Sequence, residues 1–456
     1  MIGMIVPSAF AYTITDDATG GDCSTIGTWD SASRTCTLSD DISEQIVIGA
    51  NNIVLDGNGK TILGNPNTEY SPDSYDFDRS HQYYCYGVNQ SEPAIKFNAK
   101  TNLVIKNFNI KNWCNGIVGT DSINNILQGN TITESQGGIN LASSSGDLIT
   151  QNNFDHIKET VIYLSGSDFT ISDNVIDDSN SLFMDTSNLS GFHNPTSLGI
   201  HVSGSGVIKG NTLASSESGF RNGIIKYGGE QVTIKNNNIW SMKDTGIDCS
   251  TFCNIFDNSI IFGASMDEDY TDSIGIHTGR YTSIHNNIVD NWEIALKIGD
   301  HPSLVFDNLF QNNLRAFTLS GSQYVVQNNF INNNLSGSGN DSDFDNMNTY
   351  SWPNNPSIVH NPTILNSGNY WSDYSPLCED TNNDNFCDTS YPFSGGTIKI
   401  SDDYVWKVQN GWKTTINTPS DSTVNAIDSS GLSHNYSVSA THDGTSMSVS
   451  CDHVSG

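Results

Sequence analysis

The chain has 456 residues, with 50 acidic against 19 basic side chains and a formal net charge of −31 at pH 7. Nucleic acids and anionic membrane surfaces are therefore disfavoured as partners, because binding to phosphate-rich polymers requires a basic surface. Calcium ions and neutral or cationic glycans suit an acidic chain better. Abundant Asn, Ser, Thr, Asp and Gly are typical of short strands joined by many turns.

The N-terminal residues 1–11, MIGMIVPSAFA, are apolar and end in an Ala-x-Ala-like sequence. This pattern predicts the end of a signal peptide that is cleaved after Ala11, which would export the protein to the cell surface or beyond. A buried first strand is the alternative. Residues 12–47 are expected to form an N-terminal cap. Later apolar runs are shorter than the roughly 20 residues that span a bilayer.

The chain contains nine cysteines, most of which have a near neighbour in the sequence. In an exported protein this arrangement indicates disulfides, whereas the Cys and His spacings of zinc sites are absent. The predicted pairs are Cys23–Cys36, Cys85–Cys114, Cys249–Cys253 and Cys378–Cys387, which leave Cys451 over. Sequons that would permit glycosylation begin at Asn89, Asn188, Asn334, Asn340 and Asn435.

A six-residue pattern, aliphatic-x-x-Asn-x-apolar, recurs every 21–29 residues, with one longer interval of 37. Each repeat is expected to be one rung of three short strands, because a single rung cannot bury its apolar positions without stacked neighbours. The repeated Asn would stack as an amide ladder at about 4.8 Å. An earlier copy has Phe108 at this position. The pattern places these asparagines in the ladder: Asn130, Asn152, Asn174, Asn211, Asn237, Asn258, Asn287, Asn308 and Asn329.

A second recurrent segment reads Gly-Ile-x-apolar, and its Ile should point inward and the next residue outward. Stacking the rungs predicts an outward column of Lys96, Val118, Asn140, Tyr163, His201, Ile225, Asp248, His277, Lys297 and Thr318. Insertions at 65–92, 178–197, 214–221 and 262–273 each precede such a segment, so they should emerge on one edge. Their aromatic residues, with Tyr163 and His201, could contact sugar rings.

Three ionisable residues of this column, Asp248, His277 and Lys297, fall on consecutive rungs. An acid, an imidazole and an amine together can remove and return a proton, and Arg280 or Arg221 could bind the carboxylate of an acidic sugar. These parts suit a polysaccharide lyase or a uronate epimerase. The alternative is a salt-bridged surface without activity, because outward positions on any solenoid strand are polar.

An acidic loop near the C-terminus carries oxygen side chains at alternating positions: Asp380, Asn382, Asp384 and then Asp388. This spacing is similar to the first half of an EF-hand loop and predicts a structural calcium ion. A solvated acidic turn is the alternative. The loop would cap the C-terminal end of the repeats within residues 366–412.

The repeats at about 48–375 resemble the parallel β-helix repeats shared by NosD-type periplasmic proteins, pectin-active enzymes and alginate epimerases. The segment GNYWSDYSPLCEDTNNDNFCDTSYPF at 368–393 is similar to a segment of NosD-like proteins. The resemblance implies an all-β fold, a right-handed parallel β-helix with three sheets over 48–365. Residues 413–456 resemble the first half of a hyalin-repeat domain, which implies a partial β-sandwich.

The sequence thus supports an exported protein that binds, and could modify, an extracellular polysaccharide. A non-enzymatic envelope, adhesin or filament subunit is the main alternative, in which the C-terminal β segment would mediate self-association or bind a partner domain. Copper insertion, the role that the NosD resemblance implies, is disfavoured by the absence of His or Met clusters among 11 His and 7 Met.

Overall fold

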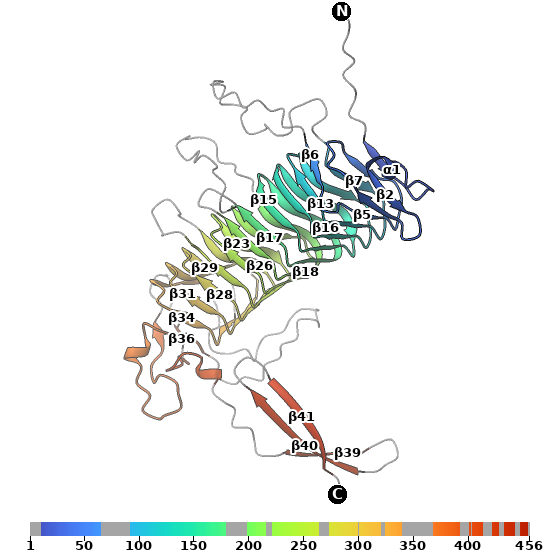
Figure 1. Ribbon diagram of the computed structural model, residues 1–456. Helices are drawn as coiled ribbons and strands as arrows, with labels where there is room; N and C mark the ends of the chain where they lie inside the picture. The colour runs from blue at the N-terminus through green and yellow to red at the C-terminus, as the bar shows by residue number, and fades with distance from the viewer. Residues whose placement is uncertain are drawn as a thin grey trace, which may run out of the picture.

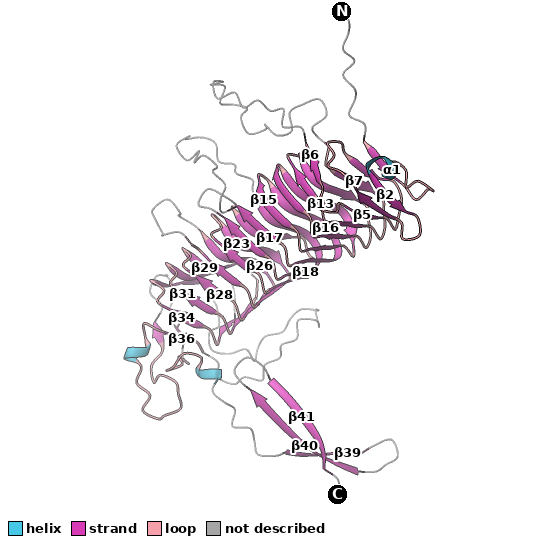
Figure 2. Cartoon of the chain, in the orientation of Figure 1, coloured by secondary structure: helices cyan, strands magenta, loops and turns pink. Residues whose placement is uncertain are grey.

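The computed structural model describes residues 11–64, 92–178, 198–215, 221–263, 273–299, 301–320, 324–339, 368–392, 401–402, 404–413, 422–427, 433–442 and 447–454. Short parallel strands stack into an elongated right-handed β-helix (Figure 1), and strands dominate the described residues (Figure 2). The expected fold class is therefore confirmed. Residues 1–10 of the proposed signal peptide at 1–11 and most of the four insertions lie outside the described residues.

The first face of the solenoid carries the Gly-Ile segments, and its strands pair in parallel from rung to rung. Its strands are β1 (Tyr12–Ile14), β4 (Ile46–Ile48), β7 (Ile95–Asn98), β10 (Asn115–Thr120), β13 (Gly137–Ser145), β16 (Thr160–Ser172), β18 (Leu198–Lys209), β20 (Asn222–Tyr227), β23 (Thr245–Thr251), β26 (Ile274–Arg280), β29 (Ile294–Ile298), β32 (Arg315–Leu319) and β35 (Leu335–Gly339).

The second face joins the first through β16 and β18, which run around the corner between the two faces and pair on both. Its other strands are β3 (Thr35–Leu38), β5 (Val54–Asp56), β8 (Val104–Lys106), β11 (Ile126–Gln128), β14 (Leu148–Thr150), β21 (Val232–Lys235), β24 (Cys253–Phe256), β27 (Ser283–His285), β30 (Leu304–Phe306) and β33 (Tyr324–Val326). The short β2 (Gly27–Asp30) pairs antiparallel with β3.

The third face is a separate sheet of 12 strands within the described residues. It consists of β6 (Thr61–Leu63), β9 (Asn109–Lys111), β12 (Thr131–Ser135), β15 (Asn153–Ile157), β17 (Val175–Asp178), β19 (Thr212–Ser215), β22 (Asn238–Trp240), β25 (Ser259–Ile261), β28 (Ile288–Asp290), β31 (Leu309–Gln311), β34 (Asn329–Ile331) and β36 (Tyr370–Trp371).

The remaining elements flank the solenoid in the sequence. They are the helix α1 (Cys23–Ile26), the 3-10 helices η1 (Ser375–Leu377) and η2 (Gly411–Lys413), the pair β37 (Tyr391–Pro392) and β38 (Ser401–Asp402), and a C-terminal antiparallel sheet of β39 (Ser422–Ile427), β40 (Ser433–His442) and β41 (Met447–Val454). None of the helices in the described residues has the length and hydrophobicity that a membrane-spanning helix requires.

The Gly-Ile segment has a steric basis at the corner between the third and first faces. The inward Ile side chains of successive rungs are fully buried and share one core, as at Ile224, Ile247 and Ile276. The preceding glycine has no room for a side chain: a Cβ on Gly246 would lie 2.6 Å from the Ile260 side chain and 2.6 Å from the Gly275 carbonyl oxygen. The sequence therefore places glycine where the rung turns most tightly.

The predicted asparagine ladder is present at the corner between the second and third faces. Each side chain donates from Nδ2 to Oδ1 of the next over 2.9–3.1 Å, and all ten are at most 3% exposed. The members are Asn130, Asn152, Asn174, Asn211, Asn237, Asn258, Asn287, Asn308, Asn328 and Asn369. The prediction of Asn329 was wrong by one residue, because Asn328 is the one that bonds Asn308.

The ladder is directional, since every amide-to-amide bond runs from Nδ2 of one rung to Oδ1 of the next rung toward the C-terminal end. At the start, Oδ1 of Asn130 accepts the Phe108 backbone N–H at 3.2 Å. At the end, Asp402 Oδ2 accepts the Asn369 backbone N–H, the Asn369 amide and the Trp371 indole N–H. The Asp402 carboxylate accepts hydrogen bonds and has none to donate, so it can end a row of donors. A further amide in its place would bring its own N–H groups, which would be buried without an acceptor.

Three of the predicted disulfides are present: Cys23–Cys36 in the N-terminal cap, Cys249–Cys253 at the end of β23, and Cys378–Cys387 in the C-terminal cap. Cys85, the predicted partner of Cys114, lies outside the described residues. The two cysteines of each cap disulfide are 13 and 9 residues apart in the sequence, respectively. These disulfides lie at the two ends of the solenoid, where a rung has a neighbour on one side only.

Removing one amide of the ladder should destabilise the fold far more than removing the adjacent surface amide. We expect Asn237→Ala to lower the free energy of unfolding by roughly 2–4 kcal/mol, because buried donors of Asn211 lose their acceptor. Asn238→Ala is the matched control, since the Asn238 side chain is exposed. Urea unfolding of both variants measures the difference. Equal unfolding midpoints would contradict a stabilising role for the ladder.

Candidate functional site

The outward column predicted for the first face has the expected register. Tyr163 is the Cα partner of His201, His201 of Ile225, and Ile225 of Asp248. Asp248 in turn pairs with His277. The column continues through Lys297 and Thr318 at one end, and through Asn140, Val118 and Lys96 at the other. It crosses β16, β18, β23, β26 and β29, which are labelled in Figure 1, and β20 between β18 and β23, at the rung spacing of about 4.8 Å.

Asp248 and His277 form the chemical centre of the column. The His277 Nδ1 lies 3.0 Å from the Asp248 Oδ1, and the two side chains are 36% and 25% exposed. The carboxylate therefore orients the imidazole and leaves its other nitrogen, Nε2, able to face solvent or substrate. Lys297 is half-buried and follows His277 directly in register. The three groups together place a carboxylate, an imidazole and an amine on three consecutive rungs.

The two arginines of the predicted site occupy different environments. Arg221 donates from Nε to Asp244, and its backbone carbonyl accepts the Asp244 N–H. Its charge is therefore already balanced by a neighbouring carboxylate. Arg280 ends β26, is exposed, and is the Cα partner of Thr251. Arg280 is the better placed of the two to meet an incoming anionic group.

An aromatic row precedes the Asp248–His277 pair along the same face. The rings of Tyr163 and His201 meet edge to face with centroids 5.1 Å apart, and His201 meets Tyr227 in the same way at 5.3 Å. Burial lowers the pKa of His201, which favours its neutral form. Tyr227 is 49% exposed. Tyr227 was not predicted from the sequence. It follows Ile225 of the column by two residues, and this spacing puts it on the same outward face.

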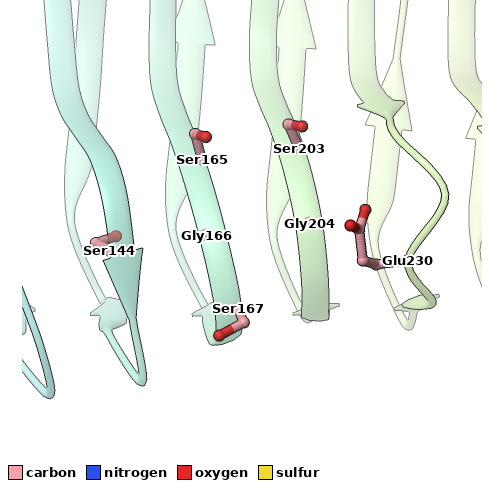
Figure 3. A pocket seen from close by; sticks show the side chains of 7 residues that line it. All are labelled: Ser144, Ser165, Gly166, Ser167, Ser203, Gly204 and Glu230. Atoms are coloured by element: carbon pink, nitrogen blue, oxygen red, sulfur yellow. The ribbon is translucent and has the colours of Figure 1, made fainter. Parts of the chain in front are cut away.

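An open hollow of about 350 Å³ lies beside this aromatic row, at the corner that β16 and β18 cross. Hydroxyl groups and bare backbone line it, and Glu230 stands at one side (Figure 3). The lining residues are Ser144, Ser165, Gly166, Ser167, Ser203, Gly204 and Glu230. None of them was singled out from the sequence. The signal was the Ser-Gly-Ser triplet that recurs on two successive rungs, at 165–167 and 203–205.

A lysine lies beneath the wall of the hollow. Lys226 points into the solenoid, is 0% exposed, and donates from Nζ to the carbonyl oxygens of Gly228 and Thr251. Burial lowers its pKa to about 8, and the negative charge of Glu230 opposes that shift. Lys226 therefore ties the turn that carries Glu230 to the next rung. Lys226 could have been predicted from the sequence, because it occupies an inward position of the alternating pattern, where the other repeats mostly have apolar residues.

The inserted segments begin and end at one corner of the solenoid, as expected. The gaps at 65–91, 179–197, 216–220 and 264–272 each separate a third-face strand from the next first-face strand. These segments therefore attach along the border of the column. The aromatic residues predicted to contact sugar within them lie outside the described residues.

The acidic loop brings side-chain oxygens of two predicted metal ligands to the backbone amide of a third. Oδ1 of Asp380 and Oδ1 of Asn382 each accept the Asp384 N–H at 3.1 Å. The Asp380 side chain is 3% exposed, and Lys407 Nζ lies 3.4 Å from its second oxygen. Asp388 instead accepts the hydroxyl and backbone N–H of Thr381, and the first of these bonds contributes most to lowering its pKa.

The loop backbone is left-handed at two asparagines, with φ of 57° at Asn383 and 72° at Asn385. Asn tolerates this conformation better than other side chains. In the described ranges, the acidic loop included, no three His, Cys, Asp or Glu side chains converge in a way that could hold a metal ion.

Comparison with known proteins identifies a family model described as periplasmic copper-binding protein (NosD), which matches residues 38–220 and 185–376. No curated protein sequence matches the chain. Similar solved structures include a mutant DFA-IIIase from Arthrobacter chlorophenolicus A6, with 10% identity over 67% of this chain and 70% of that chain and a TM-score of 0.37.

Two further structures have the same TM-score of 0.37 and 11% identity. The catalytic domain of a GH87 α-1,3-glucanase in complex with tetrasaccharides matches over 73% of this chain and 60% of that domain. The family 28 exopolygalacturonase of Yersinia enterocolitica matches over 74% of this chain and 78% of the enzyme.

The buried lysine should make stability depend on pH. Between its pKa of about 8 in the folded chain and about 10.4 in the unfolded chain, the unfolded state holds one more proton, so this group adds stability as pH rises. Lys226→Met should remove that gain, and Lys209→Met, at an exposed lysine, should retain it. Thermal midpoints measured from about pH 7.5 to 10 test this. Parallel curves for wild type and Lys226→Met would refute it.

Proposed function

Because the chain belongs to the NosD family of periplasmic proteins, we propose that it works outside the cytoplasm, where it binds and modifies an extracellular polysaccharide. Three disulfides support an oxidising compartment. The observation that carries the activity is the Asp248–His277 pair, hydrogen-bonded at 3.0 Å and in register with Lys297 on the border of the inserted loops. The substrate would lie along the column, across the rungs.

Copper, which the family description implies, does not fit the described residues. Copper sites use clusters of imidazole, thiolate or thioether ligands. In the described ranges no three His or Cys side chains converge, and six cysteines are joined in the three disulfides. The half-exposed His277 has a carboxylate as its partner instead. We therefore derive no step through copper.

The proposed chemistry is proton transfer at the carbon beside the carboxylate of a uronate. Lys297 or the Nε2 of His277 takes the proton, and Asp248 orients the imidazole and stabilises its charged form. Arg280 binds the sugar carboxylate, where negative charge develops in the transition state. In elimination the electron pair forms a carbon–carbon double bond and expels the glycosidic oxygen. In epimerisation a proton returns to the opposite face of the same carbon.

A structural calcium ion in the acidic loop is a second part of the proposal. Asp380 and Asn382 direct side-chain oxygens to the backbone N–H of Asp384, whose own Oδ1 accepts the Phe386 N–H. Calcium binds amide and backbone oxygens together with carboxylates. Asp380 is almost fully buried, and burying a carboxylate is costly without a cation. Lys407 supplies part of that charge, and calcium would supply the rest and stiffen the C-terminal cap.

The acid–base assignment predicts which substitutions abolish turnover. Asp248→Asn and Lys297→Met should each lower the rate of uronate elimination or epimerisation by at least about 100-fold, because they remove a proton-transferring or orienting group. Lys96→Met is the matched control: Lys96 belongs to the same column but pairs with Glu92. Unsaturated products are followed by absorbance and epimers by NMR, on polygalacturonate, alginate and glycosaminoglycans. Unchanged rates in both variants would exclude this mechanism.

The calcium proposal predicts a metal-dependent gain in thermal stability. Adding calcium to chelator-treated protein should raise the unfolding midpoint, because an ion that binds the folded state alone stabilises it. Asp384→Ala should abolish that rise, whereas Asp40→Ala, at an exposed acid remote in sequence, should preserve it. Differential scanning calorimetry with and without calcium gives the answer, and a calcium-dependent rise that persists in Asp384→Ala would place the ion elsewhere.

A further inference from the structure

We propose that the hollow at the corner of β13, β16 and β18 is a subsite for a neutral sugar residue, and that the substrate is therefore a polysaccharide that contains neutral as well as acidic sugars. This inference rests on the proposed function and specifies its substrate. It places sugar binding three rungs, or about 14 Å, from the rung of His277.

The shape of the hollow follows from the backbone. On the neighbouring rung β20 ends at Tyr227, and the chain turns through Glu230 before β21 begins at Val232. In contrast, β16 and β18 cross the same corner as continuous strands, so the surface is lower there (Figure 3). The hollow is thus produced by the backbone of the two rungs that contain β16 and β18.

Glycines make this continuous crossing possible. Gly166 and Gly204 are Cα partners on adjacent strands. A Cβ on Gly204 would lie 1.6 Å from the Gly166 carbonyl oxygen, and one on Gly166 would lie 1.7 Å from that of Ser144. Gly204 also has a φ of 124°, which other residues rarely adopt. The floor is therefore bare backbone, which a sugar ring can approach closely.

The lining is hydrogen-bonding but carries no positive charge. Ser165, Ser167 and Ser203 offer hydroxyl groups, and Glu230 offers an acceptor. The Ser144 hydroxyl is buried and lines the hollow, with the Asp147 carboxyl as its partner. Lys226, the nearby cation, is committed to backbone carbonyls below the surface.

An apolar surface adjoins this polar lining. Tyr163 precedes Ser165 by two residues on β16, and His201 precedes Ser203 by two on β18, so both rings face the same side as the hydroxyl groups. Tyr227 is the Cα partner of Ser203. A sugar ring has the matching combination, a face of C–H groups and a rim of hydroxyls. Glu230 would accept hydrogen bonds from a neutral sugar and would repel a uronate, so the subsite selects the neutral residue.

Binding measurements on surface variants test the subsite. The probes are neutral tetrasaccharides built from glucose, mannose or galactose, with tetragalacturonate as the acidic counterpart, and affinity is measured by calorimetry. We expect at least one neutral probe to bind, with Glu230→Gln and Tyr227→Ala each weakening it by about tenfold. Trp240→Ala is the matched control, because Trp240 is 47% exposed on the third face. It should bind as wild type does.

The outcomes separate this inference from the proposed function. Asp248→Asn should retain the neutral probe and lose turnover, which would support both. If the wild type binds neutral probes and the Glu230→Gln and Tyr227→Ala variants bind them equally well, the subsite proposal is wrong. The proposed activity at the outward column would be unaffected. If tetragalacturonate binds in the hollow and competes with the neutral probe, the selection for neutral sugar is wrong. If the protein binds neither saccharides nor polysaccharides, both proposals fall.

Discussion

The hydrogen bond from each ladder amide to the next keeps neighbouring rungs in register, and the other features of the molecule depend on that register. Strand side chains alternate between core and solvent, so a slip of one residue would turn a whole rung over. Asp248 and His277 meet because their rungs are aligned to the residue. Tyr163, His201 and Tyr227 form one aromatic row for the same reason.

Much of this arrangement could be predicted from the sequence, because each structural feature of a rung is encoded again in every repeat. Nine copies of one motif predicted the ladder, and the Gly-Ile segments predicted the outward column residue by residue. The single ladder error arose at Asn328 and Asn329, where two adjacent asparagines both satisfy a six-residue pattern. The ladder residue is Asn328, 20 residues after Asn308, whereas the motif predicted an interval of 21. The strand pairing of Leu309 with Asn329 shows this register, and the sequence alone does not.

The candidate site could be predicted less completely, because its decisive features are local exceptions to the repeat. The ion pair of Arg221 with Asp244 joins the residue before β20 to the residue before β23. Lys226 breaks the apolar inward pattern and bonds to a turn of the following rung. The hollow exists because two strands omit a turn that their neighbours make. An alignment of the repeats does not show such differences, whereas the proposed binding surface is made from them.

The one-way ladder also determines how such a molecule can change its length. In the amide-to-amide bonds, every internal asparagine accepts from the asparagine before it and donates to the one after it. Any internal rung is therefore interchangeable with any other in this respect. Duplication or deletion of a complete rung between Phe108 and Asp402 would leave each amide matched. The two ends are not interchangeable, because only a carboxylate closes the C-terminal side. Evolution can therefore lengthen the binding face in single rungs while both caps stay unchanged.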